Sequence, residues 1–139
     1  MKGEDIAEIL LDVGAVNINS VTPFKYASGI LSPIYTNCRV LTAFPRERRA
    51  VVDRMAETVE RAVDGKIDVI VGTASSGISL ATYLAQRFKL PIAYVRSSAK
   101  SHGKGKQIEG VVNEGARVLL VSDIMSTEQD IPTAVKALK

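Results

Sequence analysis

The sequence has few of the residues that build metal clusters or disulfides, and it has no long apolar run. Among its 139 residues there is one cysteine, Cys38, and one histidine, His102. A single cysteine cannot form an internal disulfide, and with a lone histidine it cannot complete a structural zinc site. No apolar segment approaches the roughly 20 residues that cross a bilayer, and the first residues carry acids where a secretory signal would be apolar. We therefore expect a cytoplasmic protein without a membrane partner.

Length and composition are typical of a water-soluble globular domain. Apolar residues make up 46% of the chain and charged residues 24%, far from the values of disordered or collagen-like chains. At about 100 to 200 residues per domain, the length predicts a single domain over residues 1–139. Within it we expect an N-terminal helix and hairpin over residues 1–40, and a core over residues 41–139.

Positive charge is concentrated in one part of the chain. Residues 69–108 contain six Lys and Arg and no Asp or Glu, whereas the rest of the chain has 12 basic residues against 15 acidic ones. Such a patch attracts phosphate-rich ligands, either a small diphosphate or a nucleic-acid backbone. Nucleic-acid binders commonly interleave basic and aromatic residues, but no Phe, Tyr or Trp lies between Arg96 and Gln107. Nucleic acid is therefore the less favoured partner.

In the first part of the chain, the spacing of apolar residues predicts two helices with a hairpin between them. Residues 4–13 have helical spacing and end near Gly14, and sparse apolar residues over 21–39 predict two short strands around a turn. A long amphipathic helix is expected to begin at Pro45 and to end near Gly65.

After residue 66 the pattern changes to short strands alternating with helices. Strands are predicted at 67–72, 91–96 and 117–122, and helices at 77–87 and from near Asp130. Apolar strands joined by helical crossovers indicate an α/β protein with a parallel sheet flanked by helices on both faces. Ligands of such sheets bind beyond the carboxyl ends of the strands.

The first motif, VGTASSGIS at residues 71–79, joins a buried strand to a helix through small residues. Backbone amides of the loop at 73–76, together with the Ser75 and Ser76 hydroxyls, could bind phosphate oxygens at the start of the helix. The alternative interpretation is an ordinary strand-to-helix turn with a serine cap.

The second motif is a long loop at 97–109, within the string YVRSSAKSHGKGKQIEG at 94–110. Its glycines at 103 and 105 would allow the loop to close as a lid. Four basic residues of the string could then neutralise a departing anion: Arg96, Lys100, His102 and Lys104. The alternative is a solvated basic loop.

The third motif is a strand that ends in Asp123 and is followed by Ser126 and Thr127. An acid at a strand end followed by a hydroxyl-rich turn suits a ribose 5-phosphate, because the carboxylate can bind ribose hydroxyls and the turn can bind the phosphate. The alternative is a capped helix start, with Ser126 and Gln129 as a capping box or Asp130 as the N-cap.

Taken together, these segments resemble orotate phosphoribosyltransferases, and they occur in that family's order. The segments are PFKYASGILSPIYTNCR (23–39), GTASSGI (72–78), YVRSSAKSHGKGKQIEG (94–110) and VLLVSDIMST (118–127). The resemblance implies a type I phosphoribosyltransferase fold with a small N-terminal hood. It also implies a homodimer in which the lid of one subunit covers the active site of its partner.

The reaction that the resemblance implies joins orotate to 5-phosphoribosyl diphosphate, giving orotidine 5′-monophosphate and diphosphate, with Mg²⁺ on the substrate and no metal-binding residues of the protein's own. Lys100, His102 and Asp123 would be catalytic. The implied substrate-binding residues are Arg96 and Lys104 in the lid motif, Thr73, Ala74, Ser75, Ser76 and Gly77 for diphosphate, Ser126 and Thr127 for the 5-phosphate, and Ser28, Gly29 and Tyr35 near orotate.

The chain departs from the family's phosphoribosyl motif, which has two adjacent acids and a later pair of glycines. Here the first acid is replaced by Ser122, and Glu128 and Gln129 stand where the glycines would be. Carboxylates beside a phosphate weaken its binding. The chain also lacks the family's closing C-terminal strands, so an open sheet edge is expected. The alternative to an enzyme is therefore a non-catalytic relative that binds a nucleotide or another protein.

Overall fold

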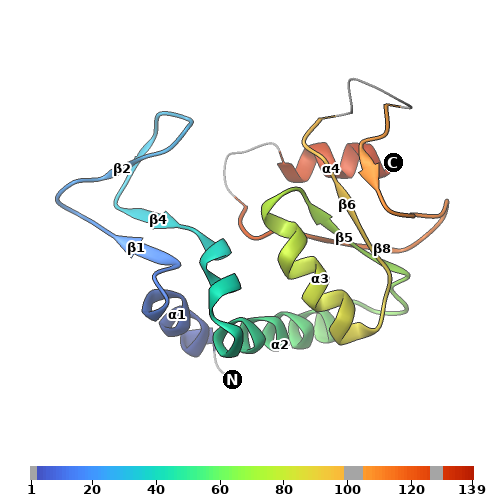
Figure 1. The fold of residues 1–139 in the computed structure, drawn as a ribbon, viewed down its shortest axis with the longest axis horizontal. Helices are drawn as coiled ribbons and strands as arrows, with labels where there is room; N and C mark the ends of the chain where they lie inside the picture. The colour runs from blue at the N-terminus through green and yellow to red at the C-terminus, as the bar shows by residue number, and fades with distance from the viewer. Residues whose placement is uncertain (1–2, 99–104, 126–129) are drawn as a thin grey trace. The chain divides into compact units, whose positions relative to one another are not determined.

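The computed structural model describes residues 3–98, 105–125 and 130–139 (Figure 1). Within these ranges no helix has both the length and the apolar character that a membrane crossing requires. Contacts divide the chain into two compact units, residues 1–51 and 52–139. The expectation of a single domain over residues 1–139 stays a prediction.

The first unit contains two small antiparallel sheets after a short helix. Its elements are α1 (Gly3–Asp12), β1 (Val16–Ile18), β2 (Phe24–Lys25), β3 (Leu31–Ser32), β4 (Ile34–Thr36), the 3-10 helix η1 (Cys38–Ala43) and the start of α2 (Pro45–Ala62). Strand β2 pairs with β3, and β1 pairs with β4. The predicted helix and the predicted hairpin are both confirmed. Strand β1 was not predicted, because a three-residue strand gives little alternation to detect.

The second unit is built on one four-stranded sheet in the order β7-β6-β5-β8. The remaining elements are β5 (Val69–Thr73), α3 (Ser76–Phe88), β6 (Ile92–Val95), β7 (Ile108–Glu109), β8 (Val118–Val121) and α4 (Asp130–Leu138). Strand β5 is parallel to both β6 and β8. The predicted parallel sheet is therefore confirmed for three strands, and β8 lies at an edge of the sheet in the described part of the chain.

The fourth strand corrects the prediction that residues 97–109 are loop throughout. Ile108 and Glu109 form β7, which pairs antiparallel with Val95 and Tyr94 of β6. Gly110 then turns the chain at a φ of 97°, and a Cβ there would lie 3.0 Å from the Cβ of Ala93. The sheet thus continues into the end of the predicted lid, which two residues could not reveal by periodicity.

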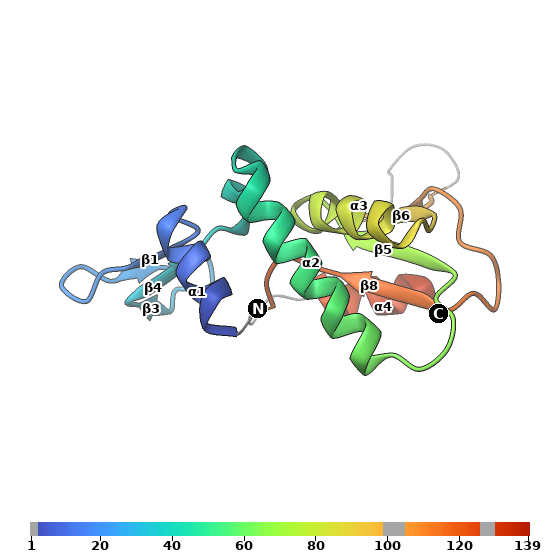
Figure 2. The same ribbon diagram turned by 90° about the horizontal axis from the view of Figure 1, so that it is seen from below.

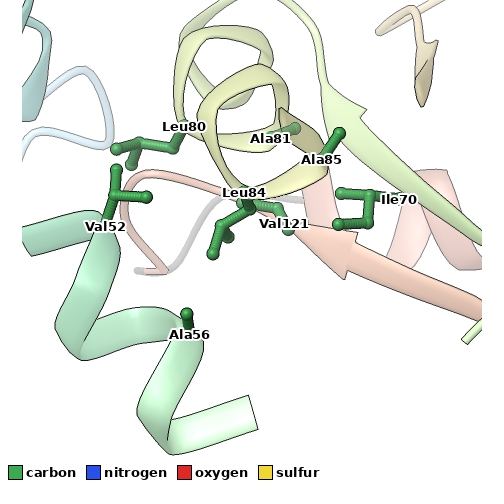
Figure 3. Close-up of a cluster of buried hydrophobic side chains, with 8 residues drawn as sticks. All are labelled: Val52, Ala56, Ile70, Leu80, Ala81, Leu84, Ala85 and Val121. Carbon is green, nitrogen blue, oxygen red and sulfur yellow. The ribbon is translucent and has the colours of Figure 1, made fainter. Parts of the chain in front are cut away.

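Helices cover both faces of this sheet, as the sequence predicts. Alternate residues of β5 point to opposite faces. Ile70 packs in a cluster with residues of α2, α3 and β8, whereas Val69 and Val71 pack with Ala134 of α4. Figure 3 shows the first cluster, in which Leu84 of α3 lies close to Val121 and is 1% exposed. Figure 2 shows α3 and α4 on opposite sides of β5 and β8.

The loop after α2 is fastened to the start of β8 by hydrogen bonds around Arg117. The Arg117 backbone N–H donates to Asp68 Oδ2 at 2.9 Å, and its Nη1 donates to the carbonyl of Asp64 at 2.7 Å. The backbone hydrogen bond from Arg117 is the main cause that lowers the pKa of Asp68 from its ordinary value of 3.8, with a smaller contribution from Lys66. The charged carboxylate is thus the form that the fold prefers.

This contact predicts an acid-dependent loss of stability. A folded pKa below the unfolded one contributes stability that is present above the unfolded value and disappears as pH falls through the folded value. Below about pH 4, urea unfolding midpoints should therefore fall less steeply for Asp68→Asn than for the wild type. The control is Asp64→Asn, which removes the same charge from a side chain with no hydrogen bond among the described residues. If Asp68→Asn and the wild type lose stability in parallel, this account is wrong.

Candidate functional site

Two of the predicted motifs meet at the carboxyl ends of neighbouring strands in the core sheet. Strands β5 and β8 are parallel neighbours, and their register pairs Gly72 with Val121. The carboxyl ends of both strands therefore lie close together. Residues 73–77 run from the last residue of β5 into the start of α3, and residues 122–125 follow β8. We call these segments the diphosphate loop and the ribose turn, after the ligands that the sequence predicts for them.

A chain of hydroxyl groups joins the two segments. Thr73 is 4% exposed, and its Oγ1 donates to Oγ of Ser122 at 3.1 Å. The Ser122 hydroxyl in turn donates to the carbonyl of Ile124, also at 3.1 Å. The hydroxyl proton of Thr73 is therefore used in a bond within the protein. Thr73 thus stabilises the diphosphate loop and does not offer a donor to a ligand.

Gly77 allows this close approach. A Cβ at this position would lie 2.6 Å from Thr73 Oγ1 and 2.7 Å from the carbonyl oxygen of Val121. Real Cβ atoms do not approach backbone atoms so closely, so a side chain here would push the diphosphate loop away from the end of β8. The sequence predicts Gly77 as part of the diphosphate loop, and the structure shows what it does there.

A second contact joins the loop to the predicted ribose ligand. The Ser76 hydroxyl donates to Oδ1 of Asp123 at 2.7 Å, and both residues are half-buried. Among the described residues, Asp123 Oδ2 accepts no hydrogen bond. One carboxylate oxygen is therefore held by the protein, and the other is left for a ligand with hydroxyl groups.

Ser75 and Ala74 complete the loop before α3. Ser75 is exposed and is the N-cap residue of α3, but its side chain makes no capping hydrogen bond. The serine cap of the alternative interpretation is therefore not made. The Ser75 hydroxyl and the first amides of α3 remain to bind an anion, which is favoured at a helix N-terminus. The Ala74–Ser75 peptide bond is cis.

The two ends of the lid motif are joined to each other. The Arg96 backbone N–H donates to the carbonyl of Gln107 at 2.9 Å, and Gln107 Nε2 donates back to the Arg96 carbonyl at 2.9 Å. Arg96 Nη1 lies 3.7 Å from Glu109 Oε1, and the buried Arg96 Nε has no hydrogen-bond partner among the described residues. These contacts hold Arg96 directly after the carboxyl end of β6.

Several predicted site residues cannot be placed in this geometry. Lys100, His102, Lys104, Ser126 and Thr127 lie outside the described residues. The predicted orotate ligands belong to the first unit, where Gly29 has a φ of 84° and the ring of Tyr35 lies 5.5 Å from that of Phe24. Ser28 is exposed in the same turn.

Sequence reasoning missed the role of Ser122, which it treated only as a lost acid. The departure from the family motif was itself the signal, because a hydroxyl can donate a hydrogen bond that a carboxylate cannot. No three His, Cys, Asp or Glu side chains in the described ranges gather to hold a metal ion. Asp123 is thus a single carboxylate in a site built mainly of hydroxyl and amide groups.

Comparisons with known proteins identify the family and the fold. The phosphoribosyl transferase domain family matches residues 41–139. Orotate phosphoribosyltransferase of Bacillus caldolyticus is 47% identical over 97% of this chain and 65% of its own length, and that of Staphylococcus haemolyticus is 43% identical over 98% and 67%. The crystal structure of orotate phosphoribosyltransferase from Aeropyrum pernix matches with a TM-score of 0.82 at 29% identity, over 96% of this chain and 72% of that one.

This core, a parallel sheet with a small-residue loop and an acid at adjacent strand ends, is a phosphoribosyl transferase domain. The chain belongs to that family, and within it to the orotate phosphoribosyltransferases. The predicted type I phosphoribosyltransferase fold is confirmed. The chain spans about two thirds of the length of the curated relatives that it matches.

The contact at Gly77 predicts the effect of adding one methyl group. Gly77→Ala should destabilise the protein by about 1–3 kcal/mol, because the new Cβ forces apart two packed backbone segments. Urea unfolding monitored by circular dichroism measures this loss. Ser79→Ala, on the same helix, is the control and should change stability by less than about 0.5 kcal/mol. Equal stability of Gly77→Ala and wild type would show that the two segments do not pack as described.

Proposed function

We propose that this chain transfers the 5-phosphoribosyl group from phosphoribosyl diphosphate to orotate, giving orotidine 5′-monophosphate and diphosphate in pyrimidine nucleotide biosynthesis. The observation that carries the proposal is the contact between the diphosphate loop and Asp123 at 2.7 Å. It supports the proposal because a loop suited to phosphate and a carboxylate suited to ribose hydroxyls lie side by side. The named relatives support orotate as the acceptor.

The chemistry needs no covalent intermediate with the protein. As the bond to diphosphate breaks, the ribose gains positive character and the leaving group gains negative charge. Amides at the start of α3 and the Ser75 hydroxyl would hold the diphosphate, while Asp123 would hold the ribose hydroxyls. The cationic residues of the lid motif would stabilise the charge that develops on the leaving group. Such positioning and preorganised charge supply large rate enhancements.

We propose Mg²⁺ as the cofactor, carried by the diphosphate and ribose oxygens of the substrate. Mg²⁺ usually takes one or two carboxylates together with phosphate oxygens and water. Asp123 would bind the ribose hydroxyls, so the ion would be held mainly by the oxygens of the substrate and by water. When bound, the ion would neutralise charge on the leaving diphosphate.

A homodimer with the lid acting in trans is also part of the proposal, and it rests on the resemblance of the lid motif. In the described residues, the two ends of the lid motif are hydrogen-bonded to each other through Arg96 and Gln107. The segment between these anchors would be the part that reaches a partner's site. The expected cytoplasmic location stays a prediction.

The direct test is an assay of the purified chain. With Mg²⁺ and phosphoribosyl diphosphate, orotate should be consumed and orotidine 5′-monophosphate should appear, as followed by orotate absorbance and chromatography. Leaving out phosphoribosyl diphosphate is the control. Absence of turnover over long incubation would exclude the activity for this chain. Tight binding of orotidine 5′-monophosphate without turnover would instead support the non-catalytic alternative.

Lys100→Ala tests the role of the lid motif. A cation that acts where charge develops stabilises the transition state more than the bound substrate. We expect kcat to fall by about a hundredfold while KM for phosphoribosyl diphosphate changes much less. Lys136→Ala, which removes an exposed lysine from α4, is the charge-matched control. A rise in KM alone would assign Lys100 to substrate binding only.

A further inference from the structure

The hydroxyl of Ser76 has a single proton, which it donates to the carboxylate of Asp123. The Oγ to Oδ1 distance is 2.7 Å, between residues 47 positions apart in the chain. Hydrogen bonds to an ionised acceptor are shorter and stronger than neutral ones. With its proton on the carboxylate, Ser76 has no proton left for a diphosphate oxygen. This separates Ser76 from Ser75, whose exposed hydroxyl makes no such contact.

The backbone around Asp123 is fixed by a different bond. The Ser122 hydroxyl donates to the carbonyl of Ile124, so the contact spans Asp123, and Thr73 holds Ser122 from the side of β5. These bonds fix the main chain on both sides of Asp123, but they leave its side-chain torsions free. The bond from Ser76 is the contact that sets the carboxylate orientation.

The orientation matters because a carboxylate binds a pair of neighbouring hydroxyls only in a defined plane. If the carboxylate could rotate, its ordering would have to occur on binding and would reduce affinity. The Ser76 bond holds Oδ1 and leaves Oδ2 without a partner among the described residues. The carboxylate is therefore ordered before a ribose arrives.

We propose that Ser76 is a positioning residue, which orients the Asp123 carboxylate and thereby gives this site its preference for a ribose with a free 2-hydroxyl. The proposal rests on the proposed function, in which Asp123 binds the ribose hydroxyls. It deepens that function, because it assigns sugar selectivity to a residue of the diphosphate loop. A residue that only supported the loop would affect ribose and deoxyribose ligands equally.

The test compares two probes that differ by one hydroxyl, ribose 5-phosphate and 2-deoxyribose 5-phosphate, titrated by calorimetry into the full chain with Mg²⁺. The wild type should bind the ribose probe more tightly. Ser76→Ala should weaken binding of the ribose probe by about three- to tenfold, the size of one hydrogen bond, with little change for the deoxyribose probe. Ser76→Thr keeps the hydroxyl and should restore the preference.

Ser79→Ala is the control, because Ser79 lies about one turn after Ser76 in α3. Its side chain has no hydrogen bond among the described residues. The variant should retain wild-type selectivity. Thermal unfolding of each variant shows whether the fold is intact, and Ser76→Thr keeps the proposal testable if Ser76→Ala unfolds. Ser76→Thr should then match the wild type in selectivity, and loss of the preference there would overturn the proposal.

Equal weakening of both probes in Ser76→Ala, or no change in either, would overturn the positioning role. Orotate turnover by the wild type would then still support the proposed function. If the wild type binds both probes equally, Asp123 does not distinguish a ribose from a 2-deoxyribose. This inference then fails, while the proposed function is unaffected. If the wild type binds neither probe, the inference fails, and the orotate assay decides separately whether the proposed reaction fails with it.

Discussion

The parallel register between β5 and β8 is the constraint on which the site depends. It brings Thr73, the last residue of β5, next to Ser122 at the end of β8, and their hydroxyls lie 3.1 Å apart. Gly77 lets the loop close onto the end of β8 without a side chain between them. A shift of either strand would separate the diphosphate loop from Asp123. The core clusters on the two faces of β5 therefore support function by holding this register.

The site uses neutral hydroxyls where the family motif has a second acid. Ser122 donates to a backbone carbonyl, a bond that a carboxylate could not make. A carboxylate about 4 Å from a phosphate would also repel it by about 1 kcal/mol in water-like surroundings, and by more where water is excluded. The substitution thus removes one negative charge beside a loop suited to diphosphate, and Asp123 remains as the carboxylate of the turn.

Arg96 shows how the sheet and the lid motif share a residue. Its backbone continues the pairing of β6 towards Gln107, while its guanidinium lies 3.7 Å from Glu109 of β7. The buried Nε with no partner among the described residues is costly to leave unsatisfied. The lid motif is therefore anchored in the sheet through the same residue that is expected to bind the leaving group.

Local periodicity and residue type were enough to predict the main helices and strands of the core, the small-residue loop at 73–77 and the acid at Asp123. They could not show β7, since two residues carry no period, nor β1, which is nearly as short. The Ser76–Asp123 and Thr73–Ser122 hydrogen bonds could not be predicted from the sequence and depend on the folded chain. Each joins residues nearly fifty positions apart, and only the parallel pairing of β5 with β8 brings them within reach.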